Sequence, residues 1–180
     1  MRLNSCKAWT NSGLKLVPLT VQDVTEQYVN WLNDPDVNQF LESRFVSHDL
    51  ASTTDFVQKC VDDPATLLLA IRCKLLSDRH VGNVKIGPID RNHGTAEVGI
   101  MIGDREAWGK GVGSGAIRIA TEIAQRELAL RRITAGCYKS NVGSWKAFTK
   151  AGFTIEGERP KHFLLNGKPE NLLLMGYSFE

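Results

Sequence analysis

The chain has 180 residues, 42% of them hydrophobic, and a formal net charge of +2 at pH 7. That length and apolar content suit one domain with a sizeable core and are small for two domains. The nearly balanced charge gives no global bias toward nucleic acid or an anionic membrane, so neither is an expected partner.

No apolar run approaches the roughly 20 residues of a membrane-spanning helix, and residues 1–12 lack the hydrophobic segment of a secretory signal. We therefore expect a soluble, cytoplasmic protein. The four cysteines are far apart in the sequence and form no C-x-x-C pair, and the four histidines show no metal-ligand spacing. Free thiols and no metal site are therefore expected.

The first third of the chain predicts a tail, a strand and two helices. Residues 1–12 are predicted to form a flexible tail ahead of a domain that fills residues 13–180. Residues 14–19 favour a strand, whereas residues 20–32 and 49–61 carry apolar side chains at helical spacing.

The segment WLNDPDV at residues 31–37, with the apolar stretch that follows it, has two interpretations. Asn, Asp and Pro are ordinary turn residues, so a packed helix end with a restart explains them. The alternative is one wall of an acceptor-substrate site. That wall would offer the flat apolar faces of Trp31, Phe40 and Phe45 and the carboxylates of Asp34 and Asp36 to a cation bearing hydroxyl groups.

The rest of the chain alternates strands and helices. Strands are predicted at 66–73, 81–90 and 95–102 as an antiparallel meander, then at 131–137, 153–165 and 171–179, the last two joined at Asn166-Gly167. Helices are predicted at 114–128 and 141–151. This mixture favours an α/β fold in a single layered domain.

Alternate glycines at residues 109–115, in WGKGVGSGA, separate the strand at 95–102 from the helix that follows. Glycines let a ligand approach main-chain N–H groups, and the first turn of a helix presents unpaired donors that suit a phosphate. The P-loop pattern is absent. A permissive dinucleotide pattern fits Gly111, Gly113 and Ala116, but the next strand lacks the acidic residue that would hold the ribose.

This stretch resembles the pyrophosphate loop of the GNAT N-acetyltransferases, in the form found in enzymes that acetylate ribosomal proteins. A second stretch, from Asn141 to Phe153, resembles the family's next motif: N-x-x-S, an aromatic residue, then Lys-x-Gly-Phe. A purely structural explanation of this second stretch is also open: Asn141 would cap the start of a helix and Gly152 would end it. Two motifs in the family's order are more specific than either one.

The resemblance implies a GNAT fold, with a mixed, mostly antiparallel sheet of roughly six or seven strands and about four helices, splayed between the strands at 95–102 and 131–137. Acetyl-CoA would lie in the splay, its pantetheine amides pairing with the backbone of Met101 and Gly103. The residues implied in cofactor binding are Met101, Ile102, Gly103, Trp108, Gly109, Lys110, Gly111, Val112, Gly113, Ser114, Gly115, Asn141 and Phe148.

Acetyl transfer to an amine requires the ammonium to lose a proton and the departing thiolate to gain one. The resemblance implies that Glu97 is the base. Many members use a tyrosine as the acid, but Phe148 stands at that position, so Ser144 is the candidate donor. A salt-bridged strand carboxylate for Glu97, a simple first-turn residue for Ser144 and water as the donor are the alternatives.

The function implied is acetyl-CoA-dependent N-acetylation of a primary amine, in a monomer or homodimer. A small amino sugar, particularly a nucleotide-linked one, is the expected acceptor, because WLNDPDV resembles the N-terminal region of amino-sugar acetyltransferases. A protein N-terminus, an aminoglycoside, a non-catalytic module that binds coenzyme A and a nicotinamide-dependent dehydrogenase are the alternatives.

Overall fold

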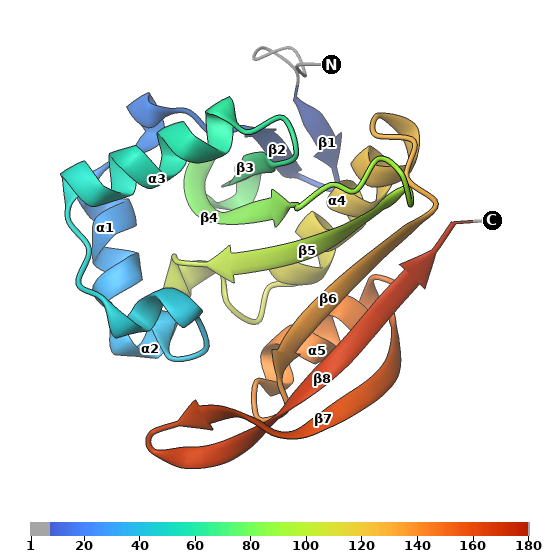
Figure 1. The fold of residues 1–180 in the computed structure, drawn as a ribbon. Coiled ribbons are helices and arrows are strands. Elements are labelled where there is room, and N and C mark those ends of the chain that lie inside the picture. Colours follow the sequence, from blue (N-terminus) through green and yellow to red (C-terminus); the bar gives the residue numbers. More distant parts are fainter. Residues whose placement is uncertain (1–7, 180) are drawn as a thin grey trace.

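One eight-stranded sheet, in the order β1-β2-β3-β4-β5-β6-β8-β7, organises residues 8–179, which are the residues that the computed structural model describes (Figure 1). The strands are β1 (Trp9–Asn11), β2 (Leu14–Pro18), β3 (Leu67–Cys73), β4 (Arg79–Ile86), β5 (Thr95–Ile102), β6 (Arg132–Tyr138), β7 (Thr154–Leu165) and β8 (Lys168–Ser178). All neighbours pair antiparallel except β5 and β6. The predicted fold class is confirmed.

The helices are α1 (Glu26–Asn33), α2 (Pro35–Asn38), α3 (Leu50–Asp62), α4 (Val112–Arg126) and α5 (Val142–Lys150). Short 3-10 turns are η1 (Val21–Asp23), η2 (Glu42–Phe45), η3 (Lys74–Leu76) and η4 (Arg105–Ala107). The predicted helix at residues 20–32 is divided into η1 and α1, because Thr20 and Thr25 each begin a new helical segment. Within residues 8–179, no helix is long and apolar enough to cross a membrane.

The predicted tail is wrong at its C-terminal end. Trp9–Asn11 form β1 and pair with β2, and Ser12 and Gly13 between them both have positive φ, as a two-residue hairpin turn requires. This strand is one reason for the count of eight instead of six or seven. Residues 1–7 of the predicted tail lie outside the described residues.

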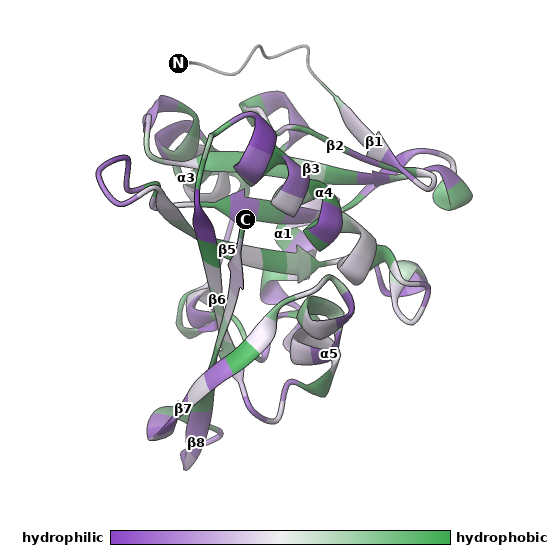
Figure 2. Cartoon of the chain, turned by 90° about the vertical axis from the view of Figure 1, so that its right-hand side faces the viewer, coloured by the Kyte–Doolittle hydropathy of each residue, from purple (hydrophilic) through white to green (hydrophobic). Residues whose placement is uncertain are grey.

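The two faces of the sheet are covered by different helices. Along β3, Leu69 and Ile71 pack in the core under α4, whereas Leu68 and Ala70 pack in a second core against α1 and α3. Both faces of this strand are therefore buried, as its unbroken apolar run predicted. The hydrophobic colouring of β3 is visible in Figure 2.

Candidate active site

The parallel pair β5 and β6 separates after three residue pairs. Thr95, Ala96 and Glu97 pair with Arg132, Ile133 and Thr134, but β5 then continues to Ile102 and β6 to Tyr138 without further pairing. The two strands diverge visibly in Figure 1. The predicted splay is present, and it leaves backbone groups on the inner edge of β5 without a strand partner, which is the arrangement that an extended ligand can complete.

The backbone groups that face this gap differ from those predicted. The Gly103 N–H donates to the carbonyl oxygen of Val81 at 3.0 Å, so Gly103 faces away from the gap. Backbone groups alternate direction along a strand, so Met101 faces β4 as well, whereas Ile100 and Ile102 face the gap. The backbone groups of the predicted pantetheine partners Met101 and Gly103 therefore face β4, whereas those of Ile100 and of Ile102, which also belongs to the predicted cofactor-binding set, border the gap.

The glycine loop ends in an uncapped helix start. Gly109 and Gly111 have φ of +72° and +76°, and Gly111 is the N-cap of α4 without a side-chain hydrogen bond to cap it. The Gly115 N–H is bonded to the Gly111 carbonyl oxygen, which leaves the first amides of α4 as free donors at the positive end of the helix dipole. This geometry supports the prediction of a pyrophosphate contact here.

The loop side chains have structural roles as well. The Trp108 Nε1–H donates to the Ile102 carbonyl oxygen at 2.9 Å, and Ser114 Oγ donates to the Gly111 carbonyl oxygen at 3.1 Å. Val112 is buried, while Lys110 and Trp108 are exposed.

Gly113 and Gly115 face neighbouring elements. A Cβ on Gly115 would lie 2.5 Å from Leu14 Cδ1, so its small size serves the packing of α4 against β2. A Cβ on Gly113 would meet Ala147 Cβ at an ordinary 3.6 Å.

The second motif forms the start of α5. Asn141 Oδ1 accepts a hydrogen bond from the Ser144 N–H at 3.1 Å, which is an ordinary N-cap. Burial raises the pKa of the Cys137 thiol, and a hydrogen bond with the Ser144 side chain partly opposes this. Phe148 is only 2% exposed and packs edge-on against Phe153, so its predicted cofactor contact is wrong: the ring belongs to the core.

The predicted base and acid lie on opposite faces of the sheet. Glu97 is exposed and pairs with Thr134, so the two side chains lie on the same face of the sheet. Tyr138, four residues after Thr134 on β6, lies on that face as well. Cys137 has the opposite parity, and Ser144 contacts it from α5. The Glu97 carboxylate thus lies where the strands part, and the Ser144 hydroxyl lies on the other face, beside a residue further along β6.

The predicted acceptor wall is largely occupied by internal contacts. Trp31 is 7% exposed, and its ring lies so close over Gly103 that a Cβ there would be 2.1 Å from it, so its face is unavailable. Asp34 and Asp36 both bind Arg105, at 2.5 and 2.8 Å. These carboxylates fasten the turn to η4, which corrects the prediction that they are free to receive a cation.

We expect the Asp34 ion pair to make stability depend on acidity. The hydrogen bond from Arg105, followed by that from the Asp36 N–H, holds the pKa of Asp34 below its ordinary value. A lowered folded-state pKa gives stability that is present above the unfolded pKa, about 3.9, and lost as pH falls through the folded value. Asp34→Asn keeps the N-cap but loses the ion pair with Arg105. The melting temperature of the variant should therefore lie below that of the parent at pH 7, and this difference should close below about pH 4. A gap independent of pH would contradict this.

Sequence analysis missed a polar cluster at the end of β6. Phe40 lies beside Tyr138, with 5.6 Å between ring centroids, and the Tyr138 hydroxyl contacts Glu42 and Arg44. Phe45 is 68% exposed, with the Arg44 guanidinium 4.1 Å from its ring centroid. The sequence signal that could have revealed this cluster was Tyr138, whose hydroxyl comes directly after the predicted strand at 131–137.

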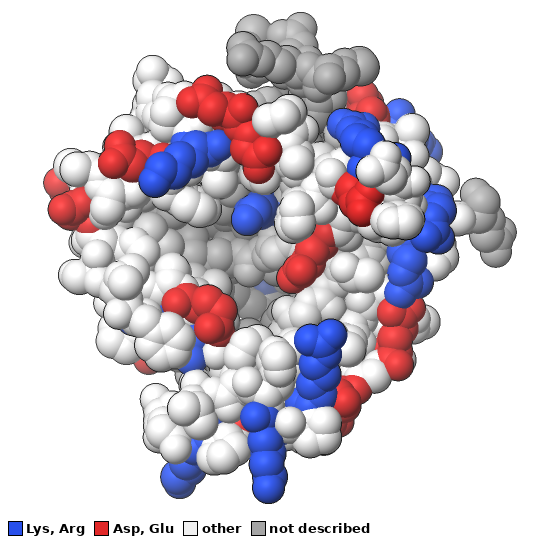
Figure 3. All heavy atoms as spheres, viewed as in Figure 1, with Lys and Arg blue, Asp and Glu red and all other residues white. Residues whose placement is uncertain are grey.

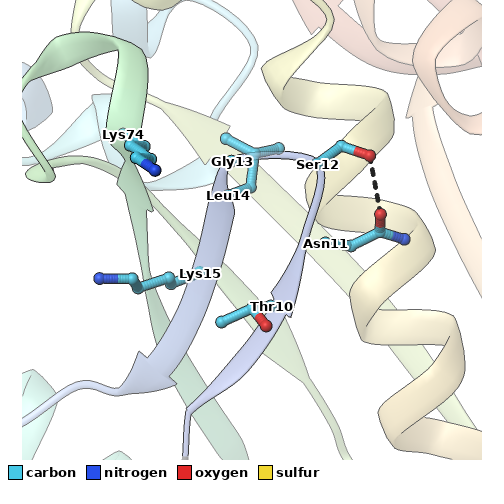
Figure 4. Close-up of a pocket in the computed structure, with 7 residues that line it drawn as sticks. All are labelled: Thr10, Asn11, Ser12, Gly13, Leu14, Lys15 and Lys74. Carbon is cyan, nitrogen blue, oxygen red and sulfur yellow. Dashed lines mark hydrogen bonds between the residues drawn. The ribbon is translucent and has the colours of Figure 1, made fainter.

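The face of the molecule shown in Figure 3 is hollowed at its centre, with acidic and basic side chains around the rim. A separate shallow cavity of about 450 Å³ lies at the β1–β2 turn. In the close-up, Lys15 and Lys74 lie on one side of the hairpin and Asn11 and Ser12 on the other (Figure 4). None of its lining residues belongs to the predicted site. Among residues 8–179, no group of His, Cys, Asp and Glu side chains could hold a metal ion.

A family model described as an acetyltransferase (GNAT) domain matches residues 14–154. The chain belongs to the GNAT acetyltransferase family. This acetyltransferase is 38% identical over 91 residues to a protein named as a probable N-acetyltransferase, YjcK of Bacillus subtilis (strain 168); the match covers 50% of this chain and 50% of that relative. It is 27% identical to spermidine N(1)-acetyltransferase of Escherichia coli (strain K12) over 165 residues, 91% of this chain and 84% of that one.

Solved structures show the same fold. A spermidine N-acetyltransferase from Vibrio cholerae, in complex with CoA and spermine, has a TM-score of 0.83 at 22% identity and covers 93% of this acetyltransferase and 96% of its own chain. The microcin C7 self-immunity acetyltransferase MccE, in complex with acetyl-CoA and AMP, has a TM-score of 0.80 at 21% identity, with 94% of each chain covered. These relatives do not support the predicted placement in the ribosomal-protein or amino-sugar branch.

Proposed function

We propose that this acetyltransferase transfers the acetyl group of acetyl-CoA to a small primary amine within a ternary complex. The observation that carries the proposal is the gap between β5 and β6, which leads to the uncapped start of α4. The gap offers backbone partners to an extended amide chain, and the helix start offers donors to a pyrophosphate. Relatives of the same fold that hold CoA or acetyl-CoA support this.

In the proposed reaction, acetyl-CoA supplies the thioester. The free N–H groups of Ile100 and Ile102 hold and polarise it from the inner edge of β5. Glu97 takes a proton from the acceptor ammonium, whose nitrogen then forms a bond to the acetyl carbon as the carbon–sulfur bond breaks. Ser144, or a water that it binds, gives a proton to the departing sulfur and regains one through solvent as the new amide nitrogen loses its second proton.

The acceptor we propose is a polyamine. The features that favoured an amino sugar, Trp31 with Asp34 and Asp36, are buried or paired with Arg105. Glu97 and Tyr138 share one face of the sheet, here called the acceptor face, and Glu42 contacts the Tyr138 hydroxyl. Glu42 and Glu97 are both exposed carboxylates, which suit an acceptor with more than one ammonium. The likeness to spermidine N(1)-acetyltransferase over 91% of the chain supports the same class. Because the Phe40 and Phe163 rings flank Tyr138, whose hydroxyl contacts Glu42, an amino sugar is the second candidate.

The test is release of free thiol from acetyl-CoA with a panel of amines: spermidine, putrescine, glucosamine, a nucleotide-linked amino sugar and an N-terminal peptide. We expect the highest kcat/KM with a polyamine. A higher value with an amino sugar or a peptide would overturn the acceptor class and leave the transferase intact. Tight binding of CoA without acetylation of any amine would indicate a non-catalytic binding module.

A further inference from the structure

We infer that Glu42 determines acceptor specificity by binding a second, non-reacting ammonium group of the acceptor, and that Tyr138 and Arg44 position its carboxylate. This inference rests on the proposed function. Glu42 lies in η2, between Phe40 and Phe45 of the predicted acceptor wall, but is not itself among the predicted site residues.

Arg44 fastens η2 to two strands that are distant in the sequence. Its Nη2 donates to the Tyr138 hydroxyl at 2.8 Å and to the Leu164 carbonyl oxygen at 2.9 Å, and its Nη1 donates to the Leu41 carbonyl oxygen at 2.8 Å. The Arg44 side chain is only 12% exposed. A single guanidinium therefore joins η2 to β6 and to the tip of the β7–β8 hairpin, and its charge is largely used within the protein.

Tyr138 orients the Glu42 carboxylate. Its ring is 3% exposed and stacks on Phe163, with centroids 4.4 Å apart and planes 15° from parallel. A guanidinium can only donate, so the Tyr138 oxygen accepts from Arg44 and its proton points to Glu42 Oε1, 2.5 Å away. The proton direction is thus fixed by the arginine, and the hydroxyl holds one carboxylate oxygen in place.

Glu42 presents its second oxygen outward. The side chain is 60% exposed, and its Oε1 receives Tyr138 and, at 3.4 Å, Arg44. No residue from 8 to 179 donates a hydrogen bond to Oε2. A carboxylate held in one orientation with a free, solvent-facing oxygen is suited to an ammonium, because less side-chain freedom is lost when the ligand binds.

Other carboxylates of this region are already engaged. Asp34 and Asp36 share Arg105, and Glu158 accepts from Lys139 with both of its oxygens. Those cations would have to be displaced before an acceptor ammonium could bind. Glu42 differs because its neighbouring cation, Arg44, is largely buried and donates at shorter distances to other acceptors.

The distance from Glu97 gives the class of acceptor. Tyr138 lies four residues beyond Thr134, the partner of Glu97, which is about 13 Å along β6 at roughly 3.3 Å per residue. An amine that delivers one nitrogen beside Glu97 can reach Glu42 only if several methylene groups separate its nitrogens. A monoamine cannot occupy both places, so Glu42 favours linear di- and polyamines.

The test compares Glu42→Gln with the parent, using spermidine and the matched monoamine butylamine as acceptors. We expect the KM for spermidine to rise at least tenfold with kcat changed less than twofold, so that the preference for spermidine over butylamine in kcat/KM falls about tenfold. Tyr138→Phe keeps the stacked ring and removes the hydroxyl that holds Glu42, so it should lower this preference by about threefold. Asp55→Asn, which removes an exposed carboxylate on α3, is the control and should leave the preference unchanged.

Calorimetry of spermidine binding in the presence of CoA gives a second measurement that needs no turnover. Glu42→Gln should weaken this binding about tenfold and flatten its dependence on salt. Equal losses for both acceptors, or no loss for either, would overturn the role of Glu42 while the transferase stands. Failure of the parent to acetylate any amine would instead refute the proposed function. Circular dichroism and an unchanged affinity for CoA confirm that the variants are folded.

Discussion

Replacement of Gly111 with Val is expected to weaken the binding of CoA by about a hundredfold. Gly111 has φ of +76°, which a β-branched residue rarely adopts, so the variant must shift the backbone at the start of α4. The first amides of the helix would then move away from the pyrophosphate. Hydrogen bonds to a charged group contribute about 1.5–3 kcal/mol each, and loss of one or two corresponds to about this factor. Isothermal calorimetry with CoA measures the change directly.

Gly167→Val is the matched control. Gly167 has φ of +75° and no atom within 4 Å of its hypothetical Cβ, so it carries the same backbone strain with open space around it. It lies in the turn between β7 and β8, far along the chain from the loop. Both variants should lose stability to a similar extent, but only the first should lose affinity for CoA. Equal affinities in two folded variants would refute the assignment of the loop.

Replacement of Glu97 with Gln is expected to lower kcat by on the order of a hundredfold. Glu97 is exposed on the acceptor face, at the last residue pair before β5 and β6 diverge. Gln keeps the shape of the side chain and cannot accept the proton of the ammonium. The pH–rate profile of the variant should differ from that of the parent, because the group that accepts the ammonium proton has been removed. Measurement of kcat from pH 5 to pH 10 with a saturating polyamine tests this.

Glu122→Gln, which removes an exposed carboxylate from α4, provides the control for a change in charge alone. Its pH–rate profile should match that of the parent. If Glu97→Gln also matches the parent in rate and profile, Glu97 is an ordinary surface carboxylate of a strand, and deprotonation of the amine must be assigned to another group or to water.

Local signals predicted most of the fold. The strand–glycine–helix unit from residue 95 to residue 126 was located from its own sequence, because glycine, apolar alternation and helical spacing act over short distances. The hairpin at Asn166-Gly167 was found for the same reason, since both residues have positive φ. The same signal at Ser12-Gly13 was present and was overlooked, which is why β1 was assigned to a tail.

The errors concern features that depend on contacts across the chain. Arg105 binds Asp34 from 71 residues away, so no local pattern shows that the carboxylate is occupied. The sequence near Trp31 predicts an aromatic side chain at the end of a helix, but it does not show that this ring packs over Gly103. Met101 and Ile102 are equally apolar, and only the register of β5 against β4 decides which backbone amide faces the gap. Tertiary pairing therefore decides which side chains are already engaged and which backbone groups border the gap.

The three-residue seam between β5 and β6 also divides the sheet mechanically. Strands β1–β5 form one hydrogen-bonded part of the sheet and β6–β8 another. Beyond Glu97 and Thr134, no further residue pair of β5 and β6 connects the two parts. Amide hydrogens in β6 and β8 can therefore exchange with solvent through an opening that leaves the β3–β4 ladder closed. An extended ligand in the gap would act as a missing strand and couple the two parts. Saturation with CoA should accordingly slow exchange at Ala135 and Cys137 far more than at Leu69 and Ala70.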